Sequence, residues 1–460
     1  FRAPSGAAAD LIHTAVRILL CLAFVGAAAG YALLTAPQSG MTALWLAAAA
    51  AFGAYMALNI GANDVANNIG PLVGARIMPL GAALAMAAVM ETAGAIIGGD
   101  QVVGTIRKGI IAPQAFADSA TYVWAMMAAL LAAAIWLNMA TALRAPVSTT
   151  HSIVGGVLGA GVAAAGFGIV DWSVMGGIAA SWVISPVLGA GLAALCLWLI
   201  GRGITGQPDI LRAAERGTPL LAAAMCWAFA AYLATKVMDL GVGTAGLAGL
   251  VPAGAVWLAM RAHVARRIPQ LRNCKSSVNR LLSVPLILAA GALSFAHGSN
   301  DVANAIGPLA GIADALASGQ ASGQAPIPMW VMVLGGAGLA AGLILFGPRV
   351  IRTIGTELTR LDATSAHSIA MAATLTVILA SQLGLPVSTT HVTVGAVLGV
   401  GFLREAMKAR AHAATPGHRA KPLVNRRLML RIFAAWIITV PATAGLAALS
   451  YFTLRGIMLP

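Results

Sequence analysis

Long apolar stretches separated by short polar segments make up most of the chain, and clear examples cover residues 16–34, 44–60, 80–98, 121–143, 176–200, 330–346, 367–385 and 432–454. A helix needs about 20 apolar residues to cross a bilayer, and hydropathy windows of that length predict about 12 transmembrane helices. The strands of a membrane β-barrel would alternate between apolar and polar positions, which these stretches do not. The pattern therefore predicts an all-α polytopic membrane protein.

The composition supports the same class, because 59% of the 460 residues are hydrophobic and only 9% are charged. Soluble proteins carry about 25% charged residues, so this chain has too little polar surface for a soluble body. The first stretch lacks a convincing small-residue cleavage pattern and is interpreted as a helix, not a removed signal. We expect a multi-pass protein of the plasma (inner) membrane, in contact with the lipid bilayer.

The net charge of +14 comes mostly from loops between the apolar stretches, at 202–216, 261–280 and 404–431. Loops rich in Lys and Arg stay on the cytoplasmic side of a membrane. Nucleic-acid binding explains these charges less well, because no aromatic residues interleave with them. We therefore expect cytoplasmic basic loops and no nucleic-acid partner.

Two unrelated motifs each occur twice, in the same order and at nearly the same spacing. "GANDVANNIGPL" starts at residue 61 and "GSNDVANAIGPL" 237 residues later, whereas "PVSTTHSIVGGVLGAG" starts at residue 146 and "PVSTTHVTVGAVLGVG" 240 residues later. Such self-similarity indicates a duplicated unit. We divide the chain into an N-terminal helix and loop (1–42), a first transport repeat (43–200), a connector with basic cytoplasmic loops and about two helices (201–280), and a second repeat (281–454).

The charges also predict how the two repeats are oriented. With the basic loops inside, the first NDVAN segment runs inward and the second runs outward. Homologous segments of opposite direction form an inverted-topology repeat, as in many secondary transporters, whose binding site lies near the midplane between the halves. The Gly- and Pro-rich segments predict re-entrant, broken helices.

Each NDVAN string places an acid between amides within an apolar stretch. A carboxylate in a transmembrane segment costs about 3 kcal/mol to insert and indicates a functional site by default. Side chains three positions apart share one helix face, and carboxylate and amide oxygens suit hard cations. The strings therefore predict one cation site in each half, formed by Asn63, Asp64, Asn67, Asn300, Asp301 and Asn304. The alternative is that these side chains only cap helix ends.

A Gly-Pro pair follows each string, at Gly70-Pro71 and at Gly307-Pro308. Proline removes a helical hydrogen bond. We expect both helices to break at these pairs and to present free backbone carbonyls to a cavity.

Hydroxyl residues follow the proline of each PVSTTH motif. Such residues cap the first amides of a helix, and those amides, with the helix dipole, bind anions. Two such helix starts facing each other predict an oxyanion site without arginine, formed by Ser148, Thr149, Thr150, Ser388, Thr389 and Thr390. Capping without a ligand is the alternative. Glycines four residues apart then follow, at Gly155, Gly159, Gly395 and Gly399, and are expected to allow close helix packing.

Three more titratable residues lie in the apolar stretches. His151 and His391 can donate to an anion, carry a proton or orient the hydroxyls, and we favour this last, supporting role. Glu91 belongs to the same supporting group, where it either completes a cation site or pairs with Arg107 or Lys108. The second half has no acid in the matching place, so the role of Glu91 is not duplicated.

The strings "GANDVAN" and "GSNDVAN", with two copies of "PVSTTH", resemble the inorganic phosphate transporter (Pit) family over residues 43–200 and 281–454. "ETAGAIIGGDQVVGTIRKGII" at 91–111 is also similar to the first repeat of that family. The resemblance implies inverted repeats with re-entrant hairpins, and a phosphate symporter driven by sodium or protons. It implies sodium ligands at the six NDVAN positions and phosphate ligands at the six STT positions. Pro71 and Pro308 replace a threonine found in the sodium-coupled branch, which the ND form otherwise resembles.

We therefore expect a secondary active symporter that imports inorganic phosphate with sodium by alternating access at a midplane site. Transport of sulfate or another oxyanion, proton coupling and a channel stay open as alternatives. The sequence has no nucleophile–base pair with an orienting acid, no metal triad and no cofactor loop, so neither an enzyme nor a bound cofactor is expected. The expected partners are phosphate, sodium and the bilayer, and a homodimer is left open.

Overall fold

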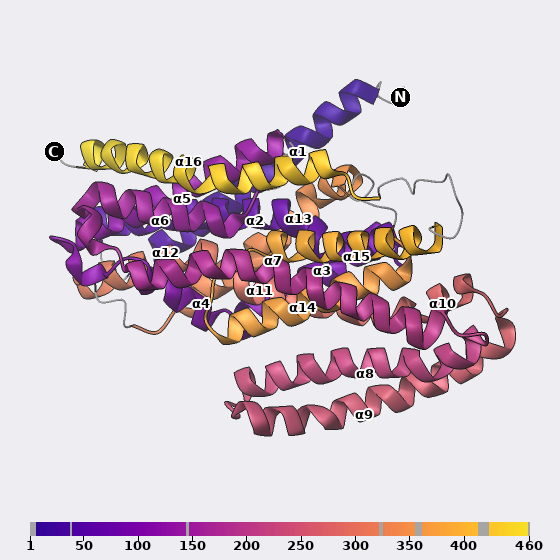
Figure 1. Cartoon of the computed structure of the whole chain (residues 1–460). Helices are drawn as coiled ribbons and strands as arrows, with labels where there is room; N and C mark the ends of the chain where they lie inside the picture. Colours follow the sequence, from indigo (N-terminus) through magenta and orange to yellow (C-terminus); the bar gives the residue numbers. More distant parts are fainter. Residues whose placement is uncertain are drawn as a thin grey trace.

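The computed structural model describes residues 6–36, 39–143, 147–321, 325–354, 361–412 and 423–458. Within these ranges the chain forms helices, turns and one isolated bridge between Ile111 and Val170 (Figure 1). The prediction of an all-α polytopic fold is confirmed. Pro146, which begins the first PVSTTH motif, lies outside the described residues.

The helices before the connector are α1 (Gly6–Thr35), α2 (Met41–Gly74), α3 (Leu80–Gly98), α4 (Asp100–Gly104), the π-helix η1 (Thr105–Gly109), the 3-10 helix η2 (Pro113–Ala115), α5 (Ser119–Ala142), α6 (Thr149–Ala165), η3 (Phe167–Ile169) and α7 (Trp172–Ile200). The connector contains η4 (Gly201–Thr205), α8 (Ile210–Val237), α9 (Val242–Arg267), η5 (Ile268–Gln270) and α10 (Lys275–Leu281). The remaining helices are α11 (Ser283–Asp301), α12 (Ala303–Ser318), α13 (Met329–Ile354), α14 (Ala363–Gln382), α15 (Thr389–His412) and α16 (Arg426–Met458).

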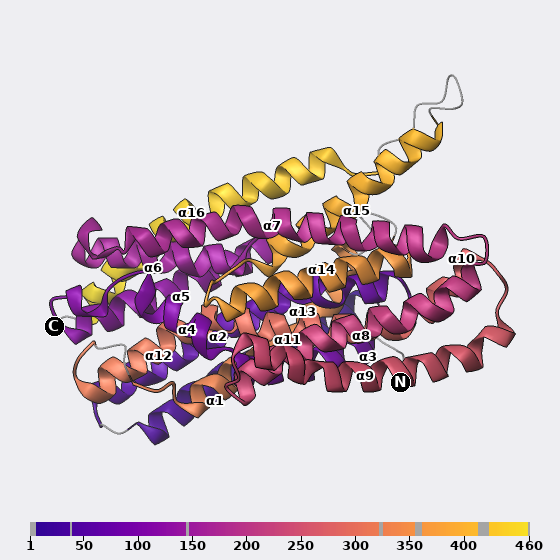
Figure 2. The same cartoon turned by 60° about the horizontal axis from the view of Figure 1, so that its bottom comes forward.

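In the described part of the chain, 10 helices are long and apolar enough to cross a membrane, or up to 11 if the pair Lys275–Leu281 and Ser283–Ser318, bent by 48°, counts as one span. The helices that start at the PVSTTH motifs are not among them. One of these, α6, has only 17 residues. The other, α15, carries Arg404, Glu405, Lys408 and Arg410 near its C-terminal end, which projects beyond its neighbours (Figure 2).

Corresponding helices of the two repeats run in opposite directions across the body. In Figure 1, α7 runs from left to right, whereas α16 runs from right to the C-terminus at the left. The repeats also exchange partners, because α2 packs along α13 and α3 along α11, while α6 packs along α16 and α7 along α15. Each repeat therefore completes its packing against the other.

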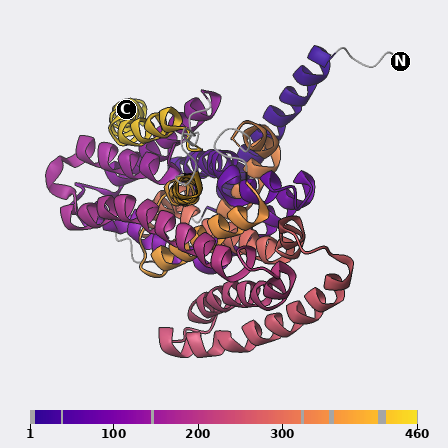
Figure 3. The same cartoon turned by 45° about the vertical axis from the view of Figure 1, so that its right-hand side comes forward.

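The basic segments gather at one end of the molecule. The connections from α7 to α8 and from α9 to α10, and the end of α15, lie together at the right of Figure 1. This is the arrangement that the positive-inside rule requires. The α8–α9 hairpin of the connector lies at the side of the body (Figures 1 and 3), where α9 packs mainly against α8.

Glycines permit the exchanged contacts, as their four-residue spacing predicted. A Cβ atom on Gly159 would lie 2.1 Å from the carbonyl oxygen of Ala444 in α16, and one on Gly399 would lie 2.2 Å from that of Ala190 in α7. Gly155 and Gly395 approach the same two helices as closely. The prediction of close helix packing at these glycines is confirmed.

The helices do not break at the Gly-Pro pairs, so that prediction is wrong. Pro71 lies inside α2 and Pro308 inside α12, and the only interruption nearby is the single residue Val302 between α11 and α12. Proline lacks an N–H group, so each ring removes the donor that would bond the carbonyl four residues earlier. These carbonyls belong to Asn67 and Asn304. The helices stay continuous, but two backbone oxygens in the NDVAN strings lose their helical hydrogen-bond donors.

Candidate functional site

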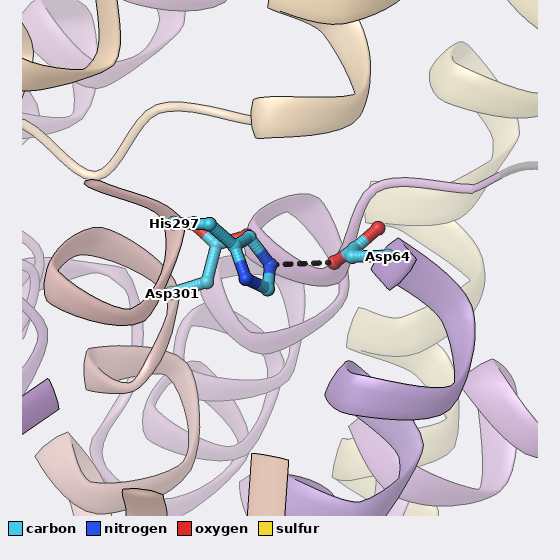
Figure 4. A group of neighbouring side chains, drawn as sticks. All are labelled: Asp64, His297 and Asp301. Carbon is cyan, nitrogen blue, oxygen red and sulfur yellow. Dashed lines mark ion pairs between the residues drawn. The ribbon is translucent and has the colours of Figure 1, made fainter. Parts of the chain in front are cut away.

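Four helices bring the two doubled motifs together in the interior. Asp64 lies in α2 and Asp301 ends α11, and the relative exposure of both residues is 0%. The PVSTTH hydroxyls stand at the starts of α6 and α15. The predicted cation site of the NDVAN strings and the predicted oxyanion site of the PVSTTH motifs therefore form one buried polar site. Figure 4 shows its two aspartates with the neighbouring His297.

Threonine hydroxyls donate hydrogen bonds to both carboxylates. Thr149 Oγ1 is 3.0 Å from Asp64 Oδ2 and 3.4 Å from Asp301 Oδ2. Thr389 Oγ1 is 2.9 Å from Asp301 Oδ2, and Thr390 Oγ1 is 2.8 Å from Asp64 Oδ1. Hydrogen bonds to charged groups are among the stronger ones in proteins, and here they hold two buried carboxylates beside the helix starts.

The asparagines link the halves in a nearly symmetric way. Asn67 Nδ2 donates to Thr390 Oγ1 at 2.8 Å, and Asn304 Nδ2 donates to Thr150 Oγ1 at 3.2 Å, so each bond joins one repeat to the other. Two further hydrogen bonds, one within each repeat, form a second pair.

That second pair involves two residues that the sequence analysis did not select. Asn63 Nδ2 donates to Thr141 Oγ1 at 3.2 Å, and Asn300 Nδ2 donates to Ser381 Oγ at 3.0 Å. Thr141 and Ser381 are the second-last residues of α5 and α14 and lie outside both motifs. They are 240 residues apart, the same spacing as the PVSTTH motifs, and this spacing could have identified them.

Ser148 and Ser388 cap their own helices. The Ser148 hydroxyl accepts a hydrogen bond from the N–H of His151 at 3.1 Å, and the Ser388 hydroxyl accepts one from the N–H of His391 at 3.2 Å. The first N–H groups of a helix have no intrahelical acceptor. Those of Thr149, Thr150, Thr389 and Thr390 remain for a ligand, and a bond of 3.0 Å from Thr150 Oγ1 to Val387 O brings the two helix starts together.

His297, which the sequence did not single out, lies next to both aspartates. Its Nε2 atom lies 3.2 Å from Asp301 Oδ2 and 3.7 Å from Asp64 Oδ2, and its Nδ1 atom lies 3.2 Å from Glu91 Oε1. The imidazole therefore stands between the two carboxylates (Figure 4). Its place four residues before Asp301, on the same helix face, was the sequence signal.

Glu91 belongs to this group rather than to an arginine pair. In addition to its contact with His297, Glu91 accepts a hydrogen bond from Asn68 Nδ2 at 2.6 Å. Arg107 instead pairs with Asp314 at 2.5 Å, and these two residues lie in η1 and α12, whereas Glu91 lies in α3. Of the alternatives for Glu91, the pairing with Arg107 is therefore wrong, and Glu91 is linked to the two aspartates through His297.

This group has no counterpart in the other half. A Cβ atom on Gly298 would meet the carbonyl of Glu91 at 2.1 Å, and one on Gly61 would meet that of Leu339 at 2.0 Å, so Leu339 occupies the position that corresponds to Glu91. Ile60 corresponds to His297 by the same alignment of the strings. The aspartates, hydroxyls and amides that occur in duplicate are thus arranged symmetrically, whereas His297, Glu91 and Asn68 lie on one side only.

His151 and His391 lie behind the helix starts, among aromatic rings. The His151 ring is 3.8 Å from that of Trp182, the His391 ring is 3.5 Å from that of Trp436, and the two imidazoles meet edge to face at 4.4 Å. These contacts fix the beginnings of α6 and α15 against α7 and α16. Whether these histidines orient the hydroxyls stays a prediction, as do the ligand roles of all residues above.

The donor set fits a hard cation. In the described part of the chain, Asn300 Oδ1, Asp301 Oδ1 and Asn304 Oδ1 are buried and have no hydrogen-bond partner. The Asp64, His297 and Asp301 ligand atoms lie within 4.8 Å of one another. Unpartnered buried oxygens and paired carboxylates are costly unless a cation or proton compensates them.

Comparison with known proteins identifies the family of the chain. The model of the phosphate transporter family matches residues 60–447. The chain belongs to the phosphate transporter family. A Helicobacter pylori (strain J99) protein named as a phosphate permease is 48% identical over 403 residues, which cover 86% of this chain and 75% of that protein. A similarly named protein of Thermococcus kodakarensis is 37% identical over 416 residues, 88% of this chain and 96% of its own length.

A solved structure described as "The sodium-dependent phosphate transporter" has a TM-score of 0.82 to this fold at 32% sequence identity, covering 90% of this chain and all of that one. The family resemblance drawn from the doubled motifs is confirmed. The protein is an integral membrane protein of a transporter family, not an enzyme.

Proposed function

We propose that this transporter is a sodium–phosphate symporter in which both ions bind at the buried site between the repeats. The observation that carries the proposal is the direct contact of Thr149, Thr389 and Thr390 with the two carboxylates. A cation held by Asp64 or Asp301 would stand beside the helix starts that receive the anion. The name of the sodium-dependent structural relative supports the choice of ion.

Sodium would bind oxygen atoms of the two NDVAN strings. Asn63, Asp64 and Asn67 supply one half-site, and Asn300, Asp301 and Asn304 the other. Hard cations prefer such carboxylate, amide and carbonyl oxygens. Each bound cation compensates a buried carboxylate and lowers the electrostatic cost of bringing an anion next to it.

Phosphate would bind between the starts of α6 and α15. The N–H groups of the first turns and the hydroxyls of Ser148 and Ser388 offer donors, and helix N-termini favour negative charge. The hydroxyls of Thr149, Thr150, Thr389 and Thr390 would turn from their present acceptors to the anion. The two halves would then rock around the loaded site and expose it to one side of the membrane at a time.

Proton coupling is the second candidate. It is favoured by His297, which stands between both carboxylates and Glu91, because histidine changes its charge near neutral pH more readily than other side chains. Sulfate transport would use the same donors. Hydrogen phosphate has an O–H group that can donate a hydrogen bond to an adjacent carboxylate, whereas sulfate has none, so the acidic neighbours favour phosphate.

Uptake into proteoliposomes tests this proposal. Labelled phosphate and labelled sulfate are supplied with and without an inward sodium gradient, at fixed pH. Sodium-dependent phosphate uptake that saturates and resists excess unlabelled sulfate is the expected result. Uptake that follows only a proton gradient, or that prefers sulfate, would contradict the sodium–phosphate assignment.

A further inference from the structure

The last two turns of the connector helix α8 contact the second repeat from outside the site. Tyr232 Oη lies 2.5 Å from Ser299 Oγ, and Thr235 Oγ1 accepts a hydrogen bond from Gln382 Nε2. Tyr232 is only 2% exposed. The connector is therefore joined to α11 and α14 by interior polar contacts as well as by the chain.

Both partners of α8 are sequence neighbours of one hydrogen bond in the site. Asn300 donates to Ser381 at 3.0 Å. Ser299 immediately precedes the donor residue, and Gln382 immediately follows the acceptor residue. Tyr232 and Thr235 thus hold the side chains of the two residues that flank the Asn300–Ser381 bond.

The first repeat contains the same bond without these supports. Asn63 donates to Thr141 at 3.2 Å, but the corresponding neighbours are Ala62 and Ala142. Alanine has no polar side-chain atom, so no hydrogen bond to a connector side chain is available there. The supporting serine and glutamine occur only in the half that faces α8.

The junction of α3, α8 and α11 is also closely packed. Ser299 Oγ donates to the carbonyl oxygen of Gly98 at 2.8 Å, so the Tyr232 hydroxyl is the donor in its bond with Ser299. A Cβ atom on Gly98 would lie 2.4 Å from Ser299 Oγ and 2.6 Å from Tyr232 Oη. A close contact of this kind leaves little room for Ser299 to shift, and hence for Asn300.

We propose that Tyr232 and Thr235 are positioning residues for the Asn300–Asp301 half-site and make it bind the coupling cation more tightly than the Asn63–Asp64 half-site. The inference rests on the proposed cation coupling. A ligand set that is already held in its bound geometry loses less entropy on binding, so the supported half-site fills first. The connector would then act on transport without touching either transported ion.

Sodium dependence of phosphate uptake tests this role. Tyr232→Phe removes the donor, and Ser299→Ala and Gln382→Ala install the residues of the first repeat. Losing one hydrogen bond weakens an interaction by roughly threefold to tenfold, so we expect the half-saturating sodium concentration to rise by that factor. The KM for phosphate at saturating sodium is expected to stay unchanged.

Trp227→Phe is the matched control. It removes the 2.9 Å bond from Trp227 Nε1 to the carbonyl of Gly246 within the α8–α9 hairpin and leaves the contacts to the repeats in place. An unchanged sodium dependence in Tyr232→Phe and Ser299→Ala would overturn the inference. Equal changes in the control would overturn it as well.

Hydrogen exchange separates this inference from the proposed function. If the wild type transports phosphate without sodium dependence, the sodium assignment fails, but the positioning role is still measurable by mass spectrometry. Tyr232→Phe is expected to accelerate exchange in the segment 298–305 and not in the equivalent segment 61–68. The same exchange rate of segment 298–305 in the wild type and in Tyr232→Phe, or equal acceleration in both segments, would overturn the positioning role.

Discussion

At the scale of single residues, the two buried aspartates carry the strongest prediction. Asp64→Asn and Asp301→Asn keep the side-chain shape but remove the negative charge that accepts hydrogen bonds from threonine hydroxyls and that would hold the proposed cation. Because bonds to charged groups contribute more than neutral ones, we expect coupled uptake to fall by roughly 10- to 100-fold or more in each variant. Radiolabelled uptake, normalised to the amount of inserted protein, measures the effect.

A capping aspartate provides the control for this experiment. Asp171→Asn changes an exposed carboxylate that caps the start of α7 and is expected to keep wild-type coupling. Full sodium-dependent uptake in Asp64→Asn or in Asp301→Asn would contradict a role of that aspartate in binding the cation.

The sequence predicted those site residues that occur in duplicate. Two copies of NDVAN and of PVSTTH made the amides, acids and hydroxyls recognisable, and the structure brings them within hydrogen-bond distance. His297 and Asn68 escaped because their counterparts are Ile60 and Ala305, so no repetition marks them. The proximity of His297 to Glu91 depends on the packing of α3 against α11, and that of Asn68 on the packing of α3 against α2, which one sequence does not reveal.

Two interior glycines lead to a stability prediction. A Cβ atom on Gly61 or Gly298 would overlap the backbone carbonyl of Leu339 or Glu91, at 2.0 and 2.1 Å. Overpacking of this kind costs about 1–3 kcal/mol, so Gly61→Ala and Gly298→Ala are expected to lower the thermal unfolding temperature in detergent. Gly177→Ala, which meets nothing within 4 Å, is expected to leave it unchanged or to raise it slightly; equal shifts in all three would contradict the close packing.

At the scale of elements, the apolar helices were predicted more reliably than their interruptions. Proline and glycine within NDVANNIGPL suggested a break, yet α2 continues through Pro71 and α12 through Pro308. A membrane helix tolerates proline where neighbouring helices satisfy or use the freed carbonyl. Which carbonyls are used depends on the four-helix junction, so the local pattern alone could not decide.

The loop between α9 and α10 allows the orientation to be tested. Hydrogen bonds with the hydroxyls of Ser276 and Ser277 lower the pKa of Cys274 to about 7. The thiolate is the reactive form, so labelling by a membrane-impermeant maleimide should accelerate as the pH rises through about 7. The other cysteines, Cys21, Cys196 and Cys226, lie in membrane-crossing helices.

Because the loop is basic, we expect Cys274 to be labelled in inside-out vesicles and to be protected in right-side-out ones. Loss of labelling in Cys274→Ser would show that the label is on Cys274. Labelling from the outer side would reverse the orientation of every helix.

At the scale of the whole molecule, neither repeat contains a complete site. Asn67 of the first repeat bonds to Thr390 of the second, and Asn304 of the second bonds to Thr150 of the first. Any rocking of one half against the other must therefore change these bonds. The proposed cation ligands and anion donors would consequently respond to the same movement.

Shared bonds of this kind predict reciprocal binding. If sodium tightens phosphate binding by a given factor, phosphate must tighten sodium binding by the same factor, because both describe one coupling free energy. Calorimetric titration of each ion at zero and at saturating concentration of the other measures both factors, and we expect enhancements of roughly 5- to 150-fold. Asp64→Asn should reduce both factors together, since it removes a carboxylate that contacts Thr149 and Thr390. Independent binding of the two ions in the wild type would mean that they do not share this site, and the hydrogen bonds between the aspartates and the PVSTTH threonines would then serve only to hold the two halves together.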